Sequence, residues 1–466
     1  SSDLTLGNIA QKENRYMNGK KILALAAASV MALSLAACSG GDNSSSTGSS
    51  GSSSGSSSTA SGNKIELEYW FEGAGPERTP VSEAIINSFN EQSTDTKVNG
   101  LYVDLSNGLD KVNVAWAGGD MPDIIYVQDS WQSTMFIQGM CLDLTERFEA
   151  WDEKDQFDVD ALESIKLKDV EGRLFAIPTA TNLNGIWWRT DVFEEKGVEA
   201  PTTWDNFFTA AEALTEETAD GKVYGYTLRG GSGAANQLLY QIVAYVGLPD
   251  FFDENGQAVI LRSQEAIDFV NKNAEMYQNG WVPESSMTAS FKEMVADFNA
   301  GLAMMLVHNL GSYENQKETF TPDQYAFINF PTAVNGQLTT VSPSAKGLVI
   351  CSTTEYPDQC WEYVKWNASE DAISDINEAV GEMPTRLDSA SHDWVKEAPH
   401  MSNLPAFQAA EKQVVIVPSY LPDYSTIQKQ TVEPLFQKVL AGEATAEQLM
   451  DTWASEFEAA YEEYNT

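Results

Sequence analysis

The sequence predicts a mixed α/β fold that begins with a parallel sheet and is divided into about two domains. At 466 residues, the chain is longer than one hydrophobic core usually serves. Residues 64–70 alternate apolar and charged side chains, as a strand with one covered face does, and a second strand is expected near residues 98–103. Residues 123–127 contain a short apolar run that suits a strand covered on both faces. With helices between them, these strands have the order of a parallel α/β sheet.

Helical segments are indicated by apolar side chains that recur every three or four positions. Val81, Ile85 and Phe89 give the first expected helix a single apolar stripe. Thr203 is expected to cap a later helix, because a hydroxyl at that position accepts a hydrogen bond from a free backbone amide. The stripes of this helix and of a helix at the C-terminus consist of Trp204, Phe207, Phe208 and Ala211, and of Leu449, Trp453, Phe457, Ala460, Tyr461 and Tyr464. We expect these side chains to form core.

The start of the chain has the pattern of an export signal. Residues 17–37 contain a short basic segment and then an apolar run that is shorter than the roughly 20 residues of a membrane-spanning helix, which predicts a signal peptide. The run ends in Leu-Ala-Ala-Cys at residues 35–38, which resembles the lipobox of bacterial lipoproteins. That resemblance implies that Cys38 carries a diacylglycerol and becomes the first mature residue. Residues 1–16 contain no export signal and no initiator Met, so we expect them to be a non-native or upstream extension.

Residues 38–63, which begin with the cysteine, are rich in Ser and Gly and predict a flexible tether. A coil of this length reaches about 25 to 30 Å, enough to hold a domain off a membrane. The formal net charge of −40 argues against binding to nucleic acid or to an anionic lipid surface. We therefore expect an extracytoplasmic protein, held by its lipid on the outer face of the cytoplasmic membrane of a Gram-positive cell.

The remaining cysteines, Cys141, Cys351 and Cys360, are odd in number and have no C-x-x-C spacing. They therefore do not form a disulfide framework or a thiolate zinc site. Buried free thiols are the expected state, and a disulfide between Cys351 and Cys360 stays open as an alternative. With three histidines, no H-E-x-x-H motif and no P-loop, we expect neither a metal nor another cofactor.

Six short motifs resemble, in the same order, those of the extracellular solute-binding family 1 of ABC transporters, which includes maltose-binding protein. They are residues 172–178 (GRLFAIP), 187–198 (WWRTDVFEEKGV), 201–207 (PTTWDNF), 298–304 (FNAGLAM), 360–365 (CWEYVK) and 381–386 (GEMPTR). The resemblance covers about residues 65–464. It departs where a Trp pair and Arg189-Thr190 replace the family's usual Tyr and Asn-Lys, which could reshape the cleft without altering the fold.

This resemblance implies a two-lobed, type II periplasmic-binding-protein-like fold whose lobes are joined by hinge crossings. By analogy the crossings lie near residues 177–178, 306–308 and 346–347. The first lobe would comprise residues 65–177 and 308–345, and the second residues 178–307 and 346–466. The resemblance also implies a monomer that encloses a small solute between closing lobes and hands it to the permease subunits of an ABC importer.

Ligand-binding side chains are expected in loops at the carboxyl ends of strands, where they face the gap between lobes. The candidates are Trp70, Phe71, Glu72, Asp129, Ser130, Trp131, Trp187, Trp188, Arg229, Gly231, His308, Asn309, Glu382 and Arg386. An aromatic platform edged by polar groups suits the apolar face and hydroxyl rim of a sugar, and the chain has 12 Trp and 17 Tyr. Each aromatic could instead pack in the core, and Arg229 and Arg386 could form ion pairs.

Two other functions stay open. A surface-anchored glycoside hydrolase would also be rich in carboxylates and aromatics, although we expect no catalytic residues here because the collinear motifs resemble those of a binding family. A binding protein for a non-sugar solute would have the same fold, and fold does not choose among ligands.

Overall fold

The computed structural model describes the chain from residue 64 onward, with short gaps. The described ranges are residues 64–72, 78–104, 108–166, 172–219, 221–341, 344–402, 406–407, 410–421 and 423–465. The predicted signal peptide, Cys38 and the predicted Ser/Gly tether lie outside them. So do the side chains of Glu72, Asp129, Ser130, Ser133 and Ser344. Among the described helices, none combines the length and the apolar character needed to cross a membrane.

The first lobe is built on a six-stranded sheet in the order β12-β4-β11-β3-β1-β2. Its strands are β1 (Ile65–Glu72), β2 (Thr96–Val103), β3 (Ile124–Val127), β4 (Ile177–Asn182), β11 (Ser344–Ile350) and β12 (Met383–Pro384). β1 is parallel to both β2 and β3, so the parallel sheet predicted at the start of the globular part is confirmed. β11 then pairs antiparallel with β3 and β4, and β12 with β4, which makes the sheet mixed.

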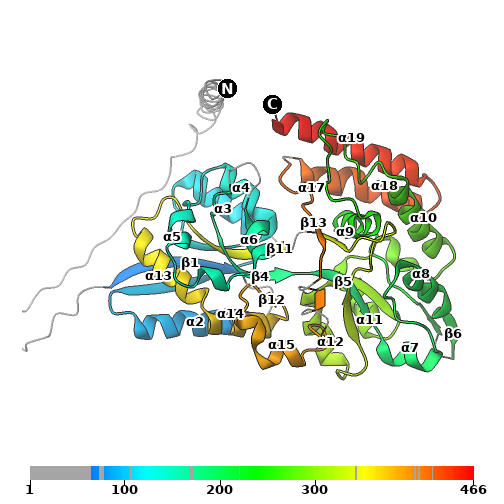
Figure 1. The fold of residues 1–466 in the computed structure, drawn as a ribbon, viewed down its shortest axis with the longest axis horizontal. Helices are drawn as coiled ribbons and strands as arrows, with labels where there is room; N and C mark the ends of the chain where they lie inside the picture. Colours follow the sequence, from blue (N-terminus) through cyan, green and yellow to red (C-terminus); the bar gives the residue numbers. More distant parts are fainter. Residues whose placement is uncertain are drawn as a thin grey trace, which may run out of the picture. The chain divides into compact units, whose positions relative to one another are not determined.

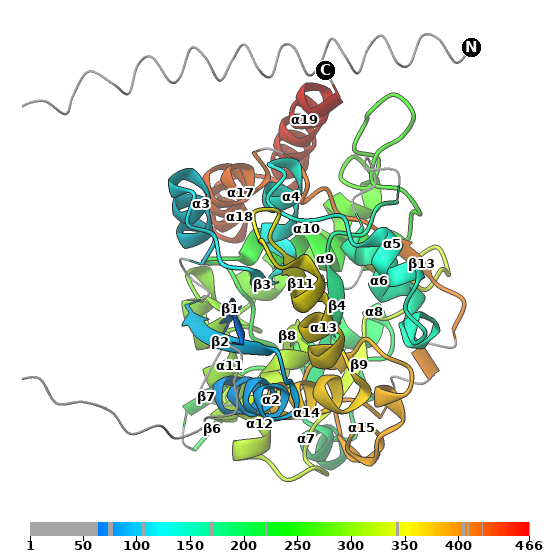
Figure 2. The same cartoon turned by 90° about the vertical axis from the view of Figure 1, so that its left-hand side faces the viewer.

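Helices cover both faces of this sheet. They are α2 (Arg78–Gln92), α3 (Gly108–Gly118), α4 (Asp129–Ile137), α5 (Thr145–Glu149), α6 (Val159–Ile165), α13 (Pro357–Asn367) and α14 (Glu370–Val380). Figures 1 and 2 both place α2 and α14 below the sheet and α3 and α4 above it. On α2, Ile85 and Phe89 of the predicted stripe are buried, as expected. Phe89 packs edge-on against Tyr363, with ring centroids 5.2 Å apart.

The second lobe contains a three-stranded antiparallel sheet, β8-β5-β9, surrounded by helices. The strands are β5 (Asn184–Trp188), β8 (Met305–Asn309) and β9 (Ala326–Asn329). The helices around this sheet include α7 (Thr190–Lys196), α8 (Trp204–Ala213), α9 (Ala234–Val246), α10 (Gln264–Gln278), α11 (Phe291–Asn299), α18 (Glu433–Leu440) and α19 (Ala446–Asn465). Thr203 caps α8 as predicted, because its side chain accepts a hydrogen bond from the Asn206 amide at 3.0 Å.

Both predicted stripes of the second lobe meet in one core. Trp204 and Phe207 of α8 and Trp453 and Phe457 of α19 are at most 4% exposed and belong to the same hydrophobic cluster.

The smaller elements are α12 (Tyr313–Thr319), α15 (Asp393–Glu397), α17 (Tyr424–Thr426), a π-helical turn (Ile427–Val432), β6 (Glu216–Thr218), β7 (Gly221–Val223), β10 (Thr339–Val341) and β13 (Gln413–Val415).

The predicted division of the later chain between the lobes is wrong. The prediction assigned residues 308–345 to the first lobe, yet β9 pairs with β5 in the second sheet. It assigned residues 346–466 to the second lobe, yet β11 pairs with β3 and β4 in the first sheet. Strand pairing therefore assigns β9 to the second lobe and β11 to the first lobe, the reverse of the prediction.

Across the described elements, the chain passes from one lobe to the other at three places. The first crossing, from β4 to β5, lies close to the predicted one and is visible across the middle of Figure 1. The second lies between β10 and β11, just before the predicted residues 346–347, and the third between β12 and β13. No crossing occurs at residues 306–308, where β8 stays paired with β5 over its whole length.

The three described cysteines are buried free thiols, as predicted, and no bridge joins Cys351 to Cys360. Burial raises the pKa of the Cys360 thiol to about 12, and burial also raises the pKa of Cys141. These thiols therefore stay protonated at neutral pH and act as core side chains.

Candidate ligand-binding site

A cavity of about 280 Å³ lies where elements of both lobes meet. The first lobe contributes Gln128, directly after β3, Asn182 at the end of β4, and Lys346 on β11. The second lobe contributes Asn184, Arg229, Asn236, Gln237, Tyr240, His308 and Asn309. The cavity therefore lies beside the crossing strands, where relative motion of the lobes would change its width.

Amide side chains dominate the lining of this cavity, and three of them have an unsatisfied atom. Gln128 Nε2, Asn182 Oδ1 and Gln237 Oε1 are buried without a hydrogen-bond partner in the described part of the chain. Their residues are 5%, 6% and 9% exposed. A buried polar atom left unpaired costs about 1 to 3 kcal/mol. Such atoms indicate that a ligand or water supplies the missing hydrogen bonds.

Two of these amides are held in a fixed orientation. Gln237 Nε2 donates to the Val307 carbonyl oxygen at 2.7 Å, and Asn182 Nδ2 donates to Glu382 Oε1 at 2.9 Å. Because an amide nitrogen must face each of these acceptors, the oxygen of each side chain is the atom left without a donor. Both residues therefore offer an oriented acceptor to a hydroxyl or N–H group.

Asn182 and Lys346 both contact the carboxylate of Glu382, which is the centre of a buried ion cluster. Glu382 accepts from Arg78 Nη2 at 2.6 Å and from Lys346 Nζ, and all three side chains are at most about a tenth exposed. Burial acts to raise the pKa of Glu382, but the charges of Lys346 and Arg78 and the hydrogen bonds from Lys346 and Asn182 outweigh it and lower the pKa to about 2. The carboxylate is therefore ionised and ties α2, β4 and β11 to the turn before β12.

The second-lobe side of the cavity contains three residues that the sequence predicted. Arg229 Nε donates to the Ser232 carbonyl oxygen at 2.7 Å. His308 shares a hydrogen bond with the Ser312 hydroxyl and stacks on Phe291, with centroids 5.7 Å apart. Burial and the charge of Arg229 lower the pKa of His308 to about 3, so its imidazole is neutral at physiological pH.

Asn309 is the third predicted residue in the lining. Its side-chain oxygen accepts from the Gly311 amide at 3.0 Å, and its carbonyl oxygen accepts from Trp187 Nε1 at 3.1 Å. These bonds fix the end of β8 at the edge of the cavity.

The predicted aromatic platform is not part of this lining. Trp70, Phe71 and Trp131 are 7%, 3% and 5% exposed and belong to the first-lobe core, because the end of β1 is covered on both faces. Trp187 has no exposed surface and packs against Phe327 and His400. Trp188 lies edge-on to Phe193, at 4.9 Å, against the second-lobe core. The structure thus makes these aromatic residues packing residues.

Three further candidates also hold the fold together instead of lining the cavity. Glu382 belongs to the ion cluster described above. Gly231 packs against backbone, where an added Cβ would lie 2.2 Å from the Thr288 carbonyl oxygen. The remaining candidates, Glu72, Asp129 and Ser130, have side chains outside the described residues.

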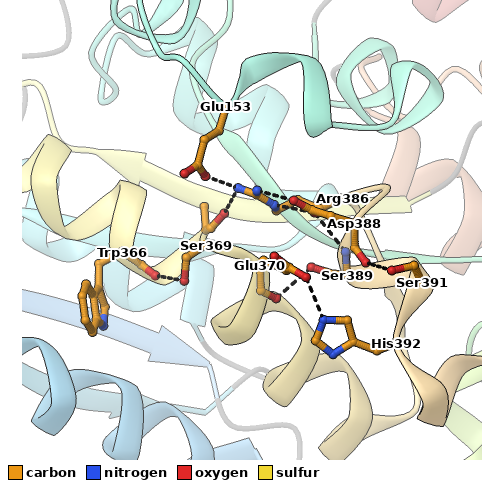
Figure 3. Close-up of polar contacts among 10 residues, drawn as sticks. Glu153, Trp366, Ser369, Glu370, Arg386, Asp388, Ser389, Ser391 and His392 are labelled. Atoms are coloured by element: carbon orange, nitrogen blue, oxygen red, sulfur yellow. Dashed lines mark hydrogen bonds and ion pairs between the residues drawn. The ribbon is translucent and has the colours of Figure 1, made fainter.

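Arg386 is the third of these residues and is surrounded by acceptors (Figure 3). It donates to Asp388 through Nε at 2.9 Å and through Nη2 at 2.6 Å. Its Nη1 donates to Glu153 at 2.7 Å and to the Ala368 carbonyl oxygen at 3.1 Å. Arg386 is 3% exposed and forms ion pairs inside the protein. Ion pairing was the alternative to ligand binding that the sequence analysis left open for this residue.

Seven lining residues were not among the predicted candidates: Gln128, Asn182, Asn184, Asn236, Gln237, Tyr240 and Lys346. Gln128 directly precedes the predicted loop 129–131, and Asn182 and Asn184 flank Leu183 at the crossing. Polar residues that interrupt apolar segments at a crossing could therefore have predicted part of the cavity lining from the sequence. The lining residues on α9 had no such signal, because a polar side chain on a helix is ordinarily solvated.

Comparison with known sequences decides the family. The sequence profile of the bacterial extracellular solute-binding protein family matches residues 72–373 of this chain. The chain belongs to this family. The matched range contains most of the motifs on which the resemblance was based.

Curated relatives are more distant in sequence. A polygalacturonan/rhamnogalacturonan-binding protein, YtcQ of Bacillus subtilis (strain 168), is 26% identical over 297 residues, which are 61% of this chain and 56% of that protein. A mannitol-binding protein of Pseudomonas aeruginosa is 24% identical over 304 residues, 60% of this chain and 68% of that protein. This chain spans little more than half the length of the first relatives that it matches.

Solved structures confirm the two-lobed type II fold. Maltose-bound MalE3 of T. maritima superposes with a TM-score of 0.70 at 20% identity, covering 85% of this chain and 99% of that one. The GacH receptor of Streptomyces glaucescens, solved unliganded and with acarbose, gives a TM-score of 0.72 at 16% identity, covering 86% and 99%. The likeness in these comparisons is one of fold.

Proposed function

We propose that this protein captures a sugar or oligosaccharide between its lobes and delivers it to the permease of an ABC importer. The observation that carries the proposal is that Gln128, Asn182 and Gln237, each with a buried and unsatisfied amide atom, line one cavity from both lobes. Sugar hydroxyls both donate and accept, so one ligand could satisfy all three atoms. The cavity of about 280 Å³ suits a small solute or one unit of a longer chain.

The names of relatives support a carbohydrate or polyol ligand. One is named as binding polygalacturonan and rhamnogalacturonan, and another as binding mannitol. The curated relatives that we compare are named as binding proteins or as a lipoprotein, which favours capture over glycoside hydrolysis.

Closure of the lobes is the proposed mechanism. Contacts from both sides of the cavity exist together only when the lobes approach, so a ligand shifts the open and closed populations by its differential affinity. Asn182 and Asn184 flank the crossing between β4 and β5, which is the proposed pivot, so they could contact ligand in either state.

Anchoring through Cys38 completes the proposal. The lipobox-like residues 35–38 and the Ser/Gly tether support a lipoprotein on the outer face of the cytoplasmic membrane, and one curated relative is a lipoprotein. A Cys38→Ser variant expressed in a bacterium with a lipoprotein-processing pathway should lose incorporation of labelled fatty acid. Equal labelling of the variant and the wild type would contradict the anchor.

A thermal-shift panel of monosaccharides, oligosaccharides and polyols tests the ligand class. A ligand present at 100 times its Kd stabilises the folded state by about 2.7 kcal/mol, which is readily measured. We expect at least one saccharide to raise the Tm. Stabilisation only by amino acids or peptides, or steady release of reducing sugar from a glycoside, would contradict the proposal.

A further inference from the structure

Arg229 is a cation on the cavity wall without an ion pair. Within the described residues, no carboxylate oxygen lies within 4.0 Å of its side-chain nitrogens. Arg78, Arg147, Arg189, Arg262 and Arg386 each have such a partner. The contrast is notable because the whole chain has 68 Asp and Glu against 28 Lys and Arg.

The guanidinium of Arg229 is held by one hydrogen bond, and its other N–H groups have no acceptor among the described residues. Its Nε donates to the Ser232 carbonyl oxygen at 2.7 Å, while neither Nη atom donates to an acceptor among the described residues. A Cβ added at Gly233 would lie 2.0 Å from Nη2, so the group rests directly on the first turn of α9. The next turns of that helix carry Asn236, Gln237 and Tyr240 of the cavity lining.

Glu433, whose charge acts on Arg229, already has a different hydrogen-bond partner. Glu433 Oε1 accepts from the Gly233 amide at 2.6 Å, at the N-terminus of α9. Burial lowers the pKa of Arg229, and the charge of Glu433 only partly opposes this effect. Among the described residues, this partly buried guanidinium therefore has no direct ion-pair partner, which an anionic ligand group would supply.

The described lining of the cavity has the same bias. It contains two cations, Arg229 and Lys346, and no Asp or Glu. A site for a neutral sugar commonly uses carboxylates, because they form strong hydrogen bonds with hydroxyls. Here the hydroxyl acceptors are instead the amide oxygens of Asn182 and Gln237, which carry no net charge.

We propose that Arg229 binds a carboxylate of the ligand, and that the site therefore selects an acidic saccharide, built from uronic acids, over its neutral counterpart. A planar guanidinium matches a carboxylate with two parallel hydrogen bonds. This inference rests on the proposed function and narrows its ligand class. A simple inorganic anion such as sulfate fits less well, because it has no O–H donor for the oxygens of Asn182 and Gln237.

Matched pairs of saccharides test the inference. Calorimetry would measure the affinity for dimers and trimers of an acidic sugar and of its neutral counterpart, at equal linkage and length. The three pairs are galacturonate and galactose, glucuronate and glucose, and mannuronate and mannose. For the pair that binds, we expect the acidic member to bind at least about tenfold more tightly in 50 mM salt. We also expect this preference to shrink as salt is raised, because the ion pair is screened.

Variants assign the preference to one side chain. Arg229→Gln should lose at least about tenfold in affinity for the acidic member and leave the neutral member within about threefold. Arg229→Lys should keep part of the preference, since it keeps the charge but not the planar fork. Arg262→Gln, which makes the same charge change outside the cavity lining, should leave both affinities unchanged. Circular dichroism and the Tm would confirm that each variant is folded.

The outcomes separate this inference from the proposed function. If the neutral member of a pair binds as tightly as the acidic one, or if Arg229→Gln keeps the full preference, the inference is overturned and saccharide binding stands. If no member of any pair binds while a non-saccharide solute does, both the inference and the proposed function are wrong.

Discussion

Asn182 donates from Nδ2 to Glu382 Oε1 at 2.9 Å, so a single side chain joins the cavity wall to the ion cluster behind it. The same carboxylate holds Arg78 and Lys346, and Lys346 itself lines the cavity. The position of two cavity residues therefore depends on one buried anion. This arrangement sets the orientation of the site before any ligand arrives.

Replacing that anion should destabilise the protein. Glu382→Gln leaves Arg78 and Lys346 buried without their shared carboxylate, and breaking a buried ion pair from one side costs about 3 to 5 kcal/mol. Urea unfolding followed by circular dichroism measures the change. As a control, Lys97→Gln breaks an exposed pair with Glu66 and should cost less than about 1 kcal/mol. Equal losses in the two variants would contradict the structural role of the cluster.

His308 should remain neutral well into the acid range. Its pKa is lowered from 6.5 to about 3, first by burial and then by the charge of Arg229. Protons therefore bind the His308 ring more readily in the unfolded chain. The contribution of His308 to the free energy of unfolding is thus constant above pH 6.5 and falls as the pH drops from 6.5 towards 3. A titration of the His308 ring resonances by NMR should show no midpoint near 6.5, and a midpoint there would contradict this environment.

Gln237 should affect ligand binding more than folding. In Gln237→Leu the unsatisfied Oε1 disappears together with the bond to the Val307 carbonyl, so the two effects on stability oppose each other. We expect affinity for the best saccharide to fall about 10- to 100-fold and the free energy of unfolding to change by less than about 2 kcal/mol. Gln264→Leu, on the surface of α10, should change neither. Unchanged affinity of the Gln237 variant would remove this residue from the site.

Trp70 should behave in the opposite way. Although the sequence placed it in the cleft, it is buried in the first-lobe core, with Lys111 Nζ 4.1 Å from the centre of its ring system. Trp70→Ala should cost about 3 to 5 kcal/mol in stability and leave saccharide affinity within about twofold. Trp453→Ala in the second-lobe core serves as a matched control and should show the same pattern. A selective loss of affinity in Trp70→Ala would restore it as a ligand contact.

The comparison of sequence and structure separates local signals from nonlocal ones. Alternation in residues 64–70 and the stripes of α8 and α19 depend on nearby residues, and they predicted strands, helices and core correctly. The pairing of β11 with β3 and β4 joins segments that are more than 150 residues apart, and nothing in their local pattern specifies it. That is why the assignment of the later segments failed.

The site was less predictable for a related reason. Aromatic residues at strand ends suggested a sugar platform, but the same residue types also fill cores, and Trp187 with no exposed surface shows which role prevailed. The amides that line the cavity become distinctive only when folding buries them without partners. Arg229, His308 and Asn309 were predictable because each lies at the end of an apolar segment of the sequence that reaches the cavity.

The most direct test of the central claim is a crystal structure of the protein with the saccharide that raises its Tm most. We predict density for the ligand between the lobes, with hydroxyls hydrogen-bonded to Asn182 Oδ1 and Gln237 Oε1 and with Gln128 and His308 on opposite sides. A saccharide bound elsewhere, with this cavity filled only by water, would contradict the account.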